Sequence, residues 1–345
     1  MSSTGLTYKD AGVDIASGDD AMGRIKKLVR KTYTPAVLNG IGGFGGLFDG
    51  RFKGMKNPVL VSSADGVGTK LKLAFMTGKH DTVGQDLVNH CVNDILVMGA
   101  RPLYFLDYFA TGKLSPAVVA DVISGMAVAC KQNGCSLIGG ETAEMPGFYQ
   151  DNEYDLAGFI VGVVDRSEIV DGSGIKPGDM IIGLESSGLH TNGYSLARKL
   201  FFDTLDLKPG DRIPELKCTV AEALMAVHRC YLKPVSKLRA AVKVHGMAHI
   251  TGGGIPGNLV RVLPKNCRAE IDLSCWKVPM LFDYMQRNGM IDEKEMFEAF
   301  NMGIGLMIVL RKKHVEEALR ILNSQKTKAF VVGEIVKGKR EVVLK

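Results

Sequence analysis

The chain has 345 residues, 46% of them hydrophobic and 23% charged, which is a composition typical of folded globular proteins. At about 100–200 residues per domain, this length favours two domains. The net charge of +6 is small, and the sequence contains no run of about five basic residues. We therefore expect no nucleic-acid partner. No apolar run approaches the roughly 18 residues of a membrane span, so we expect no membrane partner.

The cysteines and the N-terminal residues indicate the cellular compartment of the protein. The seven cysteines are odd in number and form no C-x-x-C pair, which favours buried free thiols in a reducing environment. The first 14 residues carry Lys9, Asp10 and Asp14 and lack the apolar stretch of a signal peptide. We therefore expect a cytoplasmic protein.

The first half of the chain alternates strand and helix patterns. Strands are expected at residues 58–63, 103–109, 135–138 and 156–164, and helices at 84–98 and 115–134. The polar, glycine-rich stretch 165–179 then predicts a domain boundary. We place one domain at residues 1–170 and a second at 171–345.

The second half continues with mixed elements. Strands are expected at 180–184, 247–250, 268–273, 303–310 and 329–335. Helices are expected at 194–202, 219–245 and 314–323, with two more beginning near Pro279 and Asp292. The predicted fold class is α/β (α+β), built as two mixed-sheet domains.

The expected helix 84–98 has an unusual polar face. Asp86, His90 and Asp94 recur every four residues and so share one side, and residues 81–100 contain no Lys or Arg. Asp86 and Asp94 lie about 12 Å apart along the axis, too far to bind one ion together. Either one carboxylate joins a site with other segments, or this face packs against another subunit.

Two glycine-rich loops offer further carboxylates. Asp65 and Lys70 flank glycines after the first strand, an arrangement that suits a magnesium-nucleotide but also an ordinary strand-to-helix turn. The loop 139–147 places Glu141 after a buried strand. Mg²⁺ favours one or two protein carboxylates together with substrate phosphates, so Asp65, Asp94 and Glu141 are candidate ligands.

Other loops leave alternatives open. The polar loop 186–193 could bind a phosphate or ribose, or could simply be capped by its Ser and Asn side chains. His190 and His249 lie beside glycine-rich loops as proton carriers or as structural groups. Two G-x-G-x-x-G matches, at 40–45 and 252–257, give only weak support for a dinucleotide site.

A set of sequence strings identifies a resemblance that covers essentially the whole chain. In order they are LTYKDAGVDI (6–15), GGFGGLF (42–48), DGVGTK (65–70), VNDI (92–95), FLDYFATGKL (105–114), GGETAEMPG (139–147), SSGLHTNGYSLARK (186–199), HITGGG (249–254) and FNMGIG (300–305). Together they resemble the phosphoribosylformylglycinamidine cyclo-ligase (AIR synthetase) family, from the superfamily that includes selenophosphate synthetase and formylglycinamide ribonucleotide amidotransferase. The absence of Cys from residues 1–90 argues against selenophosphate synthetase.

The resemblance implies an activity and an assembly. The reaction is ATP-dependent closure of formylglycinamidine ribonucleotide, a small anionic substrate, to aminoimidazole ribonucleotide with release of ADP and phosphate. The implied cofactors are ATP and Mg²⁺. The implied partner is a second copy of the chain, with the N-terminal domains of the homodimer pairing into a shared β-barrel.

The resemblance also implies roles for residues at matching positions. Asp65, Asp94 and Glu141 would hold Mg²⁺, and the implied catalytic residues are His190, Lys70 and Asp94. The residues implied to contact nucleotide are Gly42, Gly43, Gly45, Gly46, Asp65, Gly66, Gly68, Thr69 and Lys70. The residues implied to hold the phosphoribosyl substrate are Ser187, His190, Asn192, Gly193, Thr251, Gly252 and Gly253. Residues 6–15 would close over the site.

Two other classes of function remain as alternatives. One is a regulatory or assembly module that holds ATP without turning it over. The other is a nicotinamide-dependent dehydrogenase.

Overall fold

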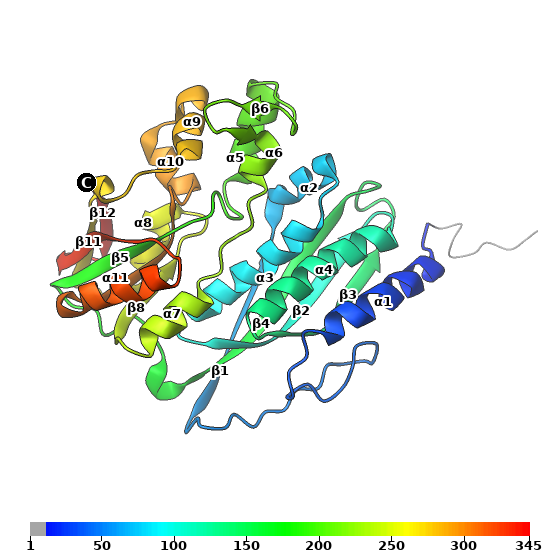
Figure 1. Cartoon of the computed structure of the whole chain (residues 1–345), viewed down its shortest axis with the longest axis horizontal. Helices are drawn as coiled ribbons and strands as arrows, with labels where there is room; N and C mark the ends of the chain where they lie inside the picture. The colour runs from blue at the N-terminus through cyan, green and yellow to red at the C-terminus, as the bar shows by residue number, and fades with distance from the viewer. Residues whose placement is uncertain (1–11) are drawn as a thin grey trace, which may run out of the picture.

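The computed structural model describes residues 12–345, so most of the string 6–15 lies outside the described part. Two sheet-and-helix units lie side by side, one built from the first half of the chain and one from the second (Figure 1). A small two-stranded ribbon, β6 (Arg212–Ile213) with β7 (Cys218–Thr219), projects from the second unit.

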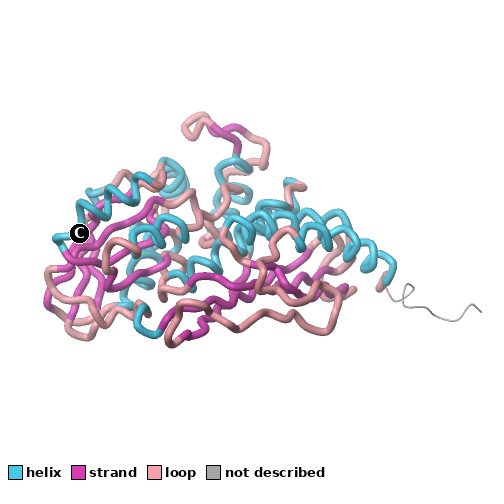
Figure 2. Tube along the Cα trace, turned by 60° about the horizontal axis from the view of Figure 1, so that its bottom comes forward, coloured by secondary structure: helices cyan, strands magenta, loops and turns pink. Residues whose placement is uncertain are grey.

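The first unit is a four-stranded sheet covered by helices on one face. The strands run in the order β1 (Pro58–Gly66), β4 (Tyr154–Asp165), β2 (Arg101–Thr111), β3 (Ser136–Glu144). The helices that belong to it are α1 (Ile15–Arg30), η1 (Gly68–Lys70), α2 (Leu71–Thr77), α3 (Asp81–Leu96) and α4 (Pro116–Gln132). In the right half of Figure 2, helices form a layer along one side of the strands.

Residue alternation explains why only one face is covered. In β2, Phe105 and Phe109 point to the helix side and are buried, whereas Leu106 between them is only half-buried. On the other face, Leu60 and Phe159 expose 60% and 45% of their surface. This face is therefore open and apolar in a single copy of the chain.

The second unit is a six-stranded sheet. Its strands run in the order β12 (Glu341–Leu344), β9 (Cys267–Ile271), β11 (Ala329–Lys337), β5 (Asp179–Glu185), β10 (Ile304–Arg311), β8 (Val244–His249). Its helices are η2 (Arg166–Glu168), α5 (Tyr194–Arg198), the π-helix η3 (Lys199–Thr204), α6 (Val220–Leu224), α7 (Leu232–Arg239), α8 (Gly254–Leu259), η4 (Val260–Val262), η5 (Leu273–Cys275), α9 (Met280–Gly289), α10 (Glu293–Ala299), η6 (Lys312–His314) and α11 (Val315–Ser324).

The predicted fold class is confirmed: the structure has two units, each with a mixed sheet. Two local predictions are wrong. Residues 65–66 and 139–144 extend β1 and β3 instead of forming loops, because their backbones pair with β4 and β2. The helices expected within 219–245 are α6 and α7, and an irregular segment, residues 225–231, separates them.

The division of the chain into two domains at residue 170 stays a prediction.

Across the described residues, none of the helices is both long and apolar enough to cross a membrane.

Candidate active site

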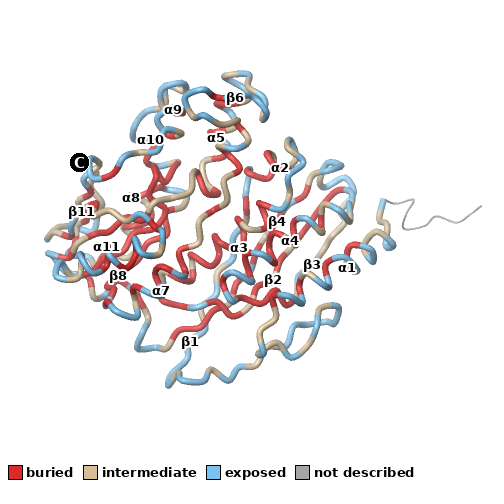
Figure 3. The backbone as a smooth tube through the Cα atoms, viewed as in Figure 1, coloured by how far each residue is buried: buried red, intermediate tan, exposed pale blue. Residues whose placement is uncertain are grey.

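Helix α3 forms the centre of the candidate site because it contacts both halves of the chain. Its Leu87 packs toward the first sheet, while its Asp86, Asn89 and Asn93 bond to the backbone of residues 228–231. Most of the helix is buried, as Figure 3 shows for its path through the middle of the molecule. The polar face thus packs against the second half of the same chain.

Two carboxylates meet at His90. The Asp65 carboxylate lies 2.8 Å from His90 Nε2, and that of Asp94 lies 3.7 Å from the same atom. Ser63 Oγ donates to Asp94 at 3.2 Å. Asp65 stands on β1 facing the helices, so the strand and the helix bring together two acidic residues 29 positions apart. Both carboxylates remain partly exposed, at 44% and 23%.

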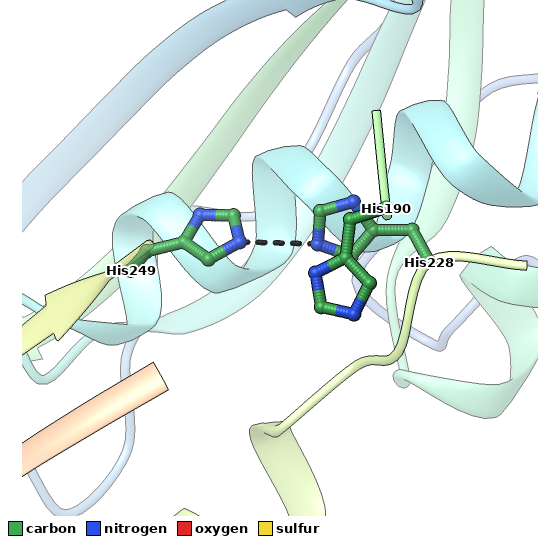
Figure 4. Close-up of side chains that lie close together, drawn as sticks. All are labelled: His190, His228 and His249. Atoms are coloured by element: carbon green, nitrogen blue, oxygen red, sulfur yellow. Dashed lines mark hydrogen bonds between the residues drawn. The ribbon is translucent and has the colours of Figure 1, made fainter. Parts of the chain in front are cut away.

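The network continues into the second half of the chain through histidines. Asp94 accepts from His249 Nδ1 at 2.8 Å, and His249 Nε2 lies 3.0 Å from His228 Nε2 (Figure 4). Thr191 Oγ1 contacts His90 Nδ1 at 2.7 Å and His228 Nδ1 at 3.3 Å. His249 ends β8, and His228 lies in the irregular segment 225–231, so the network, with Asp65 on β1, joins five separate stretches of chain.

The charges of this network differ from one imidazole to the next. Burial works to lower the pKa of His90, but Asp65 and Asp94 outweigh it and raise that pKa above its usual value. Burial lowers the pKa of His228 well below its usual value and also lowers the pKa of His249. Partial burial works to raise the pKa of Asp65, but the contact with His90 holds it below the usual range. The two carboxylates therefore favour the protonated form of His90, whereas burial favours the neutral forms of His228 and His249.

His190 packs flat against His228, with ring centroids 4.0 Å apart and planes inclined by 21°. Its side chain is fully buried, which lowers its pKa well below the usual value. Its Nε2 accepts from the Ser187 backbone N–H at 3.2 Å, and its buried Nδ1 has no hydrogen-bond partner. The partner of Nε2 assigns the proton to Nδ1, so the ring offers an N–H donor.

Two groups of side chains lie close enough to be considered as metal ligands. His190, His228 and His249 form the first group, but a metal lies in the plane of a ligating imidazole at about 2 Å, and two nearly parallel stacked rings cannot share one. The second group contains His90, Asp94 and His249, with Asp65 beside His90. Two partly exposed carboxylates at one point fit a divalent cation that prefers oxygen.

The structure places the ammonium of Lys70 away from the exposed carboxylates of Asp65 and Asp94. Its side chain is fully buried and its Nζ lies 2.7 Å from Asp86, so the ammonium faces the interior rather than solvent. The neighbouring Thr69 is exposed and its Oγ1 contacts Ser195 Oγ at 3.0 Å. Gly66 and Gly68 adjoin Asp65 at the end of β1, and Gly68 has a positive φ of 64°.

Glu141 does not join Asp65 and Asp94 within one chain. Asp65 aligns with Gly158, Asp107 and Gly140 across the sheet, whereas Glu141 stands in the next row, which points to the opposite face. Three strand spacings of about 4.8 Å also separate β1 from β3. The exposed Glu141 carboxylate therefore lies on the open face.

The Gly42–Gly46 loop is also separated from the histidines. Gly46 approaches Ile138 on the open face of the sheet, where residues 46–52 border a cavity of about 440 Å³ with Leu60 and Leu106. Gly42, at the other end of the loop, approaches Lys26 on α1. Glu141 and Gly46 thus lie on the face of the sheet opposite to Asp65.

The residues implied for the substrate do lie together, beside the histidine network. Asn192 Oδ1 accepts from Gly252 N at 3.0 Å, which joins the loops 186–193 and 251–253. Gly193 and Gly253 have positive φ angles of 76° and 91° and are the N-cap residues of α5 and α8. Thr251 Oγ1 bonds to Asn258, and Ser187 Oγ donates to the Val227 carbonyl. Buried Asn192 Nδ2 has no partner, so an N–H donor remains available here.

Sequence reasoning missed His228, Thr191 and Asn93 as members of the network. His228 was missed because it lies within residues 219–245, where helices are expected, and a histidine in a helix is an ordinary feature. The signal that could have found Asn93 and Thr191 is their position, since Asn93 adjoins Asp94 and Thr191 adjoins His190.

The fold places the chain among proteins built from two sheet-and-helix units, and comparisons with known proteins identify the family. The family model of the AIR synthase related protein, N-terminal domain, matches residues 51–164 of this chain. The model of the AIR synthase related protein, C-terminal domain, matches residues 176–345. The chain is 56% identical over 333 residues to phosphoribosylformylglycinamidine cyclo-ligase of Thermodesulfovibrio yellowstonii, covering 96% of this chain and 97% of that protein. It is 55% identical to that of Geotalea daltonii, covering 98% and 97%. The chain belongs to the phosphoribosylformylglycinamidine cyclo-ligase family.

Solved structures with the same fold are more distant in sequence. Thiamine-monophosphate kinase from Stenotrophomonas maltophilia K279a superposes with a TM-score of 0.71 at 18% identity, covering 94% of this chain and 96% of that one. A hydrogenase maturation protein HypE in complex with ATP gives 0.67 at 18% identity, covering 94% and 90%. These likenesses concern the fold alone.

Proposed function

We propose that the chain closes the imidazole ring of aminoimidazole ribonucleotide from formylglycinamidine ribonucleotide, with ATP converted to ADP and phosphate. The observation that carries the proposal is 56% identity, over nearly the whole length, to a protein named for this reaction. The site supports it, because two partly exposed carboxylates and several neutral donors lie close together where the two units contact each other.

The reaction needs an activated formyl oxygen, since an amide oxygen is a poor leaving group. The γ-phosphoryl group of ATP moves to that oxygen and ADP departs. The amidine nitrogen then attacks the formyl carbon, a C–N bond closes the ring, and phosphate leaves with the oxygen while nitrogen loses a proton. Positioning and neutralisation of charge account for most of the rate of such a transfer.

Asp65 and Asp94 would hold Mg²⁺, and this proposal is supported by their approach to the same point beside His90. A bound Mg²⁺ supplies neutralisation of phosphate charge. His90 and His249 orient the two carboxylates through contacts of 2.8 Å each. Gly68 and Thr69 are exposed residues shortly after Asp65, and this position suits contact with a nucleotide. Glu141 and the Gly42–Gly46 loop would join this site only from a second copy of the chain.

Donors on the loops 186–193 and 251–253 would hold the phosphoribosyl substrate. Asn192 and His190 each retain a buried N–H without a partner, which supports this assignment. The acceptor nitrogen of His190 is already used by Ser187. We therefore propose that His190 donates a hydrogen bond to charge developing on the reacting oxygen, rather than removing a proton.

The assembly we propose is a homodimer formed through the open face of the first sheet, where Leu60, Leu106 and Phe159 gather. We also propose a cytoplasmic location. The seven cysteines support it, because all of them are free thiols.

The direct test is to incubate the protein with Mg-ATP and formylglycinamidine ribonucleotide and to follow products by mass spectrometry. We expect a product lighter by one water, together with stoichiometric ADP. ATP binding without ADP or the cyclised product would contradict the proposal and indicate a binding module instead.

A further inference from the structure

The most deeply buried ion pair of the described chain lies behind the histidines. Lys70 and Asp86 have no exposed side-chain surface, and Lys70 Nζ lies 2.7 Å from Asp86 Oδ2. Lys70 ends η1 and Asp86 lies on α3, so both belong to the first unit. Isolated burial of such charges costs several kcal/mol, and a pair is tolerated only when hydrogen bonds satisfy the remaining donors and acceptors.

Those hydrogen bonds all go to the second unit. Lys70 Nζ donates to the Ala226 carbonyl at 2.8 Å and to the His190 carbonyl at 3.3 Å. Asp86 Oδ1 accepts from the His228 backbone N–H at 2.7 Å. The ammonium therefore uses its three N–H groups on one carboxylate and two carbonyls, and none remains for a phosphate.

The segments held by this pair carry the stacked imidazoles. His190 has a positive φ of 63°, which is uncommon for a residue other than glycine and needs support from its surroundings. Residues 225–231 have no regular secondary structure of their own. The bonds from Lys70 and Asp86 fix both backbones at the positions from which the rings of His190 and His228 stack.

We propose that Lys70 and Asp86 are positioning residues that hold His190 and His228 in their reactive arrangement across the two units, and that Lys70 has no contact with nucleotide. This inference rests on the proposed function for its kinetic consequences only. The arrangement of the two rings is a property of the free protein.

The test is the double variant Lys70→Met/Asp86→Asn. It removes both charges together, so no unpaired ion stays buried, and the amide introduced in place of the Asp86 carboxylate keeps an acceptor for the His228 N–H. We expect kcat for ring closure to fall at least 30-fold while KM for ATP changes less than 3-fold. A phosphate-binding lysine would instead raise KM for ATP by 10-fold or more, and that result would overturn the proposal.

The matched control is Lys72→Met, two residues further along. Lys72 pairs with Glu153 at the surface, so we expect kcat and KM within 2-fold of wild type.

A second readout does not depend on turnover. Nitrogen-15 NMR of the imidazoles should show His190 of the wild-type protein as the Nδ1–H form, because Ser187 donates to Nε2. In the double variant we expect mixed tautomers for His190. A wild-type spectrum together with wild-type kcat in a folded double variant would overturn the inference, whereas an inactive wild-type protein would contradict only the proposed function.

If the double variant does not fold, both readouts are taken on Lys70→Gln/Asp86→Asn, which also removes both charges and keeps an N–H donor on the side of the Ala226 and His190 carbonyls. Wild-type kcat and a single His190 tautomer there would also overturn the inference.

Discussion

At the residue scale, Asp94 joins more elements than any other carboxylate of the network. Its two oxygens contact Ser63 on β1 and His249 at the end of β8, and Oδ2 also approaches His90 on its own helix. An amide at this position has one acceptor instead of two and no charge. It would leave His90 with Asp65 as its main anionic neighbour.

We therefore expect Asp94→Asn to lower kcat for ring closure by at least about 100-fold, the size of effect typical of losing one preorganised electrostatic contact. The measurement is ADP release under saturating substrates, with circular dichroism to check the fold. Asp121→Asn, on the exposed surface of α4, is the control and should match wild type. Undiminished turnover in folded Asp94→Asn would remove this residue from the metal and catalytic roles.

Asp107 offers a second residue-scale prediction, through pH. It lies on β2 beneath the helices, and burial raises its pKa from 3.8 to about 7. The folded state holds this proton more tightly than the unfolded chain, so the free energy of unfolding falls as pH rises from about 4 to 7. Between pH 5 and 8 the loss from this group amounts to about 2–3 kcal/mol.

Asp107→Asn should remove that part of the pH dependence. Urea unfolding at pH 5 and pH 8 measures it, with Asp155→Asn at an exposed site of β4 as the control. Equal pH dependence in wild type and Asp107→Asn would show that the Asp107 carboxyl is not held protonated by the fold.

A residue of the site could be predicted where its neighbours in the sequence already indicated a functional role. Asp65 after a strand and Asp94 on a polar helix face indicated a site, and the structure brings them together. Lys70 was not interpretable in this way, because its partner Asp86 lies 16 positions away and nothing in the sequence tells a buried ammonium from an exposed one. The face that Glu141 occupies could not be predicted, because it depends on alternation along an extension of β3 that the sequence did not reveal.

At the element scale, the contact of α3 with α4 depends on two glycines. A Cβ on Gly125 would lie 1.8 Å from the Asp81 carbonyl, and one on Gly84 would lie 2.1 Å from the Val122 carbonyl. The two helix backbones therefore touch directly. This close approach sets the position of α3, and with it Asp86, His90 and Asp94.

Gly125→Ala should destabilise the protein by about 3 kcal/mol or more, because backbone rather than a flexible side chain must move. Gly23→Ala is the matched control: it lies in α1 with open space around its Cβ, and the better helix propensity of Ala should stabilise by up to about 1 kcal/mol. Urea denaturation gives both values. A stability loss of less than 1 kcal/mol for Gly125→Ala would mean that the helices are not in backbone contact.

Strands and long helices followed from periodicity, and short elements did not. Strands β10 and β11 were predicted within a few residues, because apolar runs bounded by turn residues are distinctive. Helix α1 went unpredicted. The 219–245 stretch has helical periodicity throughout, yet residues 225–231 leave the helix where their backbone bonds to α3 instead.

At the scale of the whole molecule, the first sheet separates two groups of residues that the family resemblance assigns to one nucleotide. Asp65 and the histidines lie on the helix-covered side, whereas Glu141 and Gly46 lie on the open side. A second copy packed on the open face would cover its apolar residues. It would also bring Glu141 and Gly46 of one copy close to the edge of the first sheet in the other copy. Within one chain these residues cannot approach Asp65.

This arrangement predicts that Leu60→Arg disrupts a homodimer. Leu60 exposes 60% of its surface on the open face, and a charge there would be buried without a partner on association. Sedimentation velocity should show a wild-type dimer and a monomeric variant, with ring closure reduced at least 10-fold because each site lacks the residues of its neighbour. Met290→Arg is the control, since Met290 is 92% exposed at the end of α9 in the other unit. A monomeric wild-type protein with full activity would contradict both the dimer and the shared site.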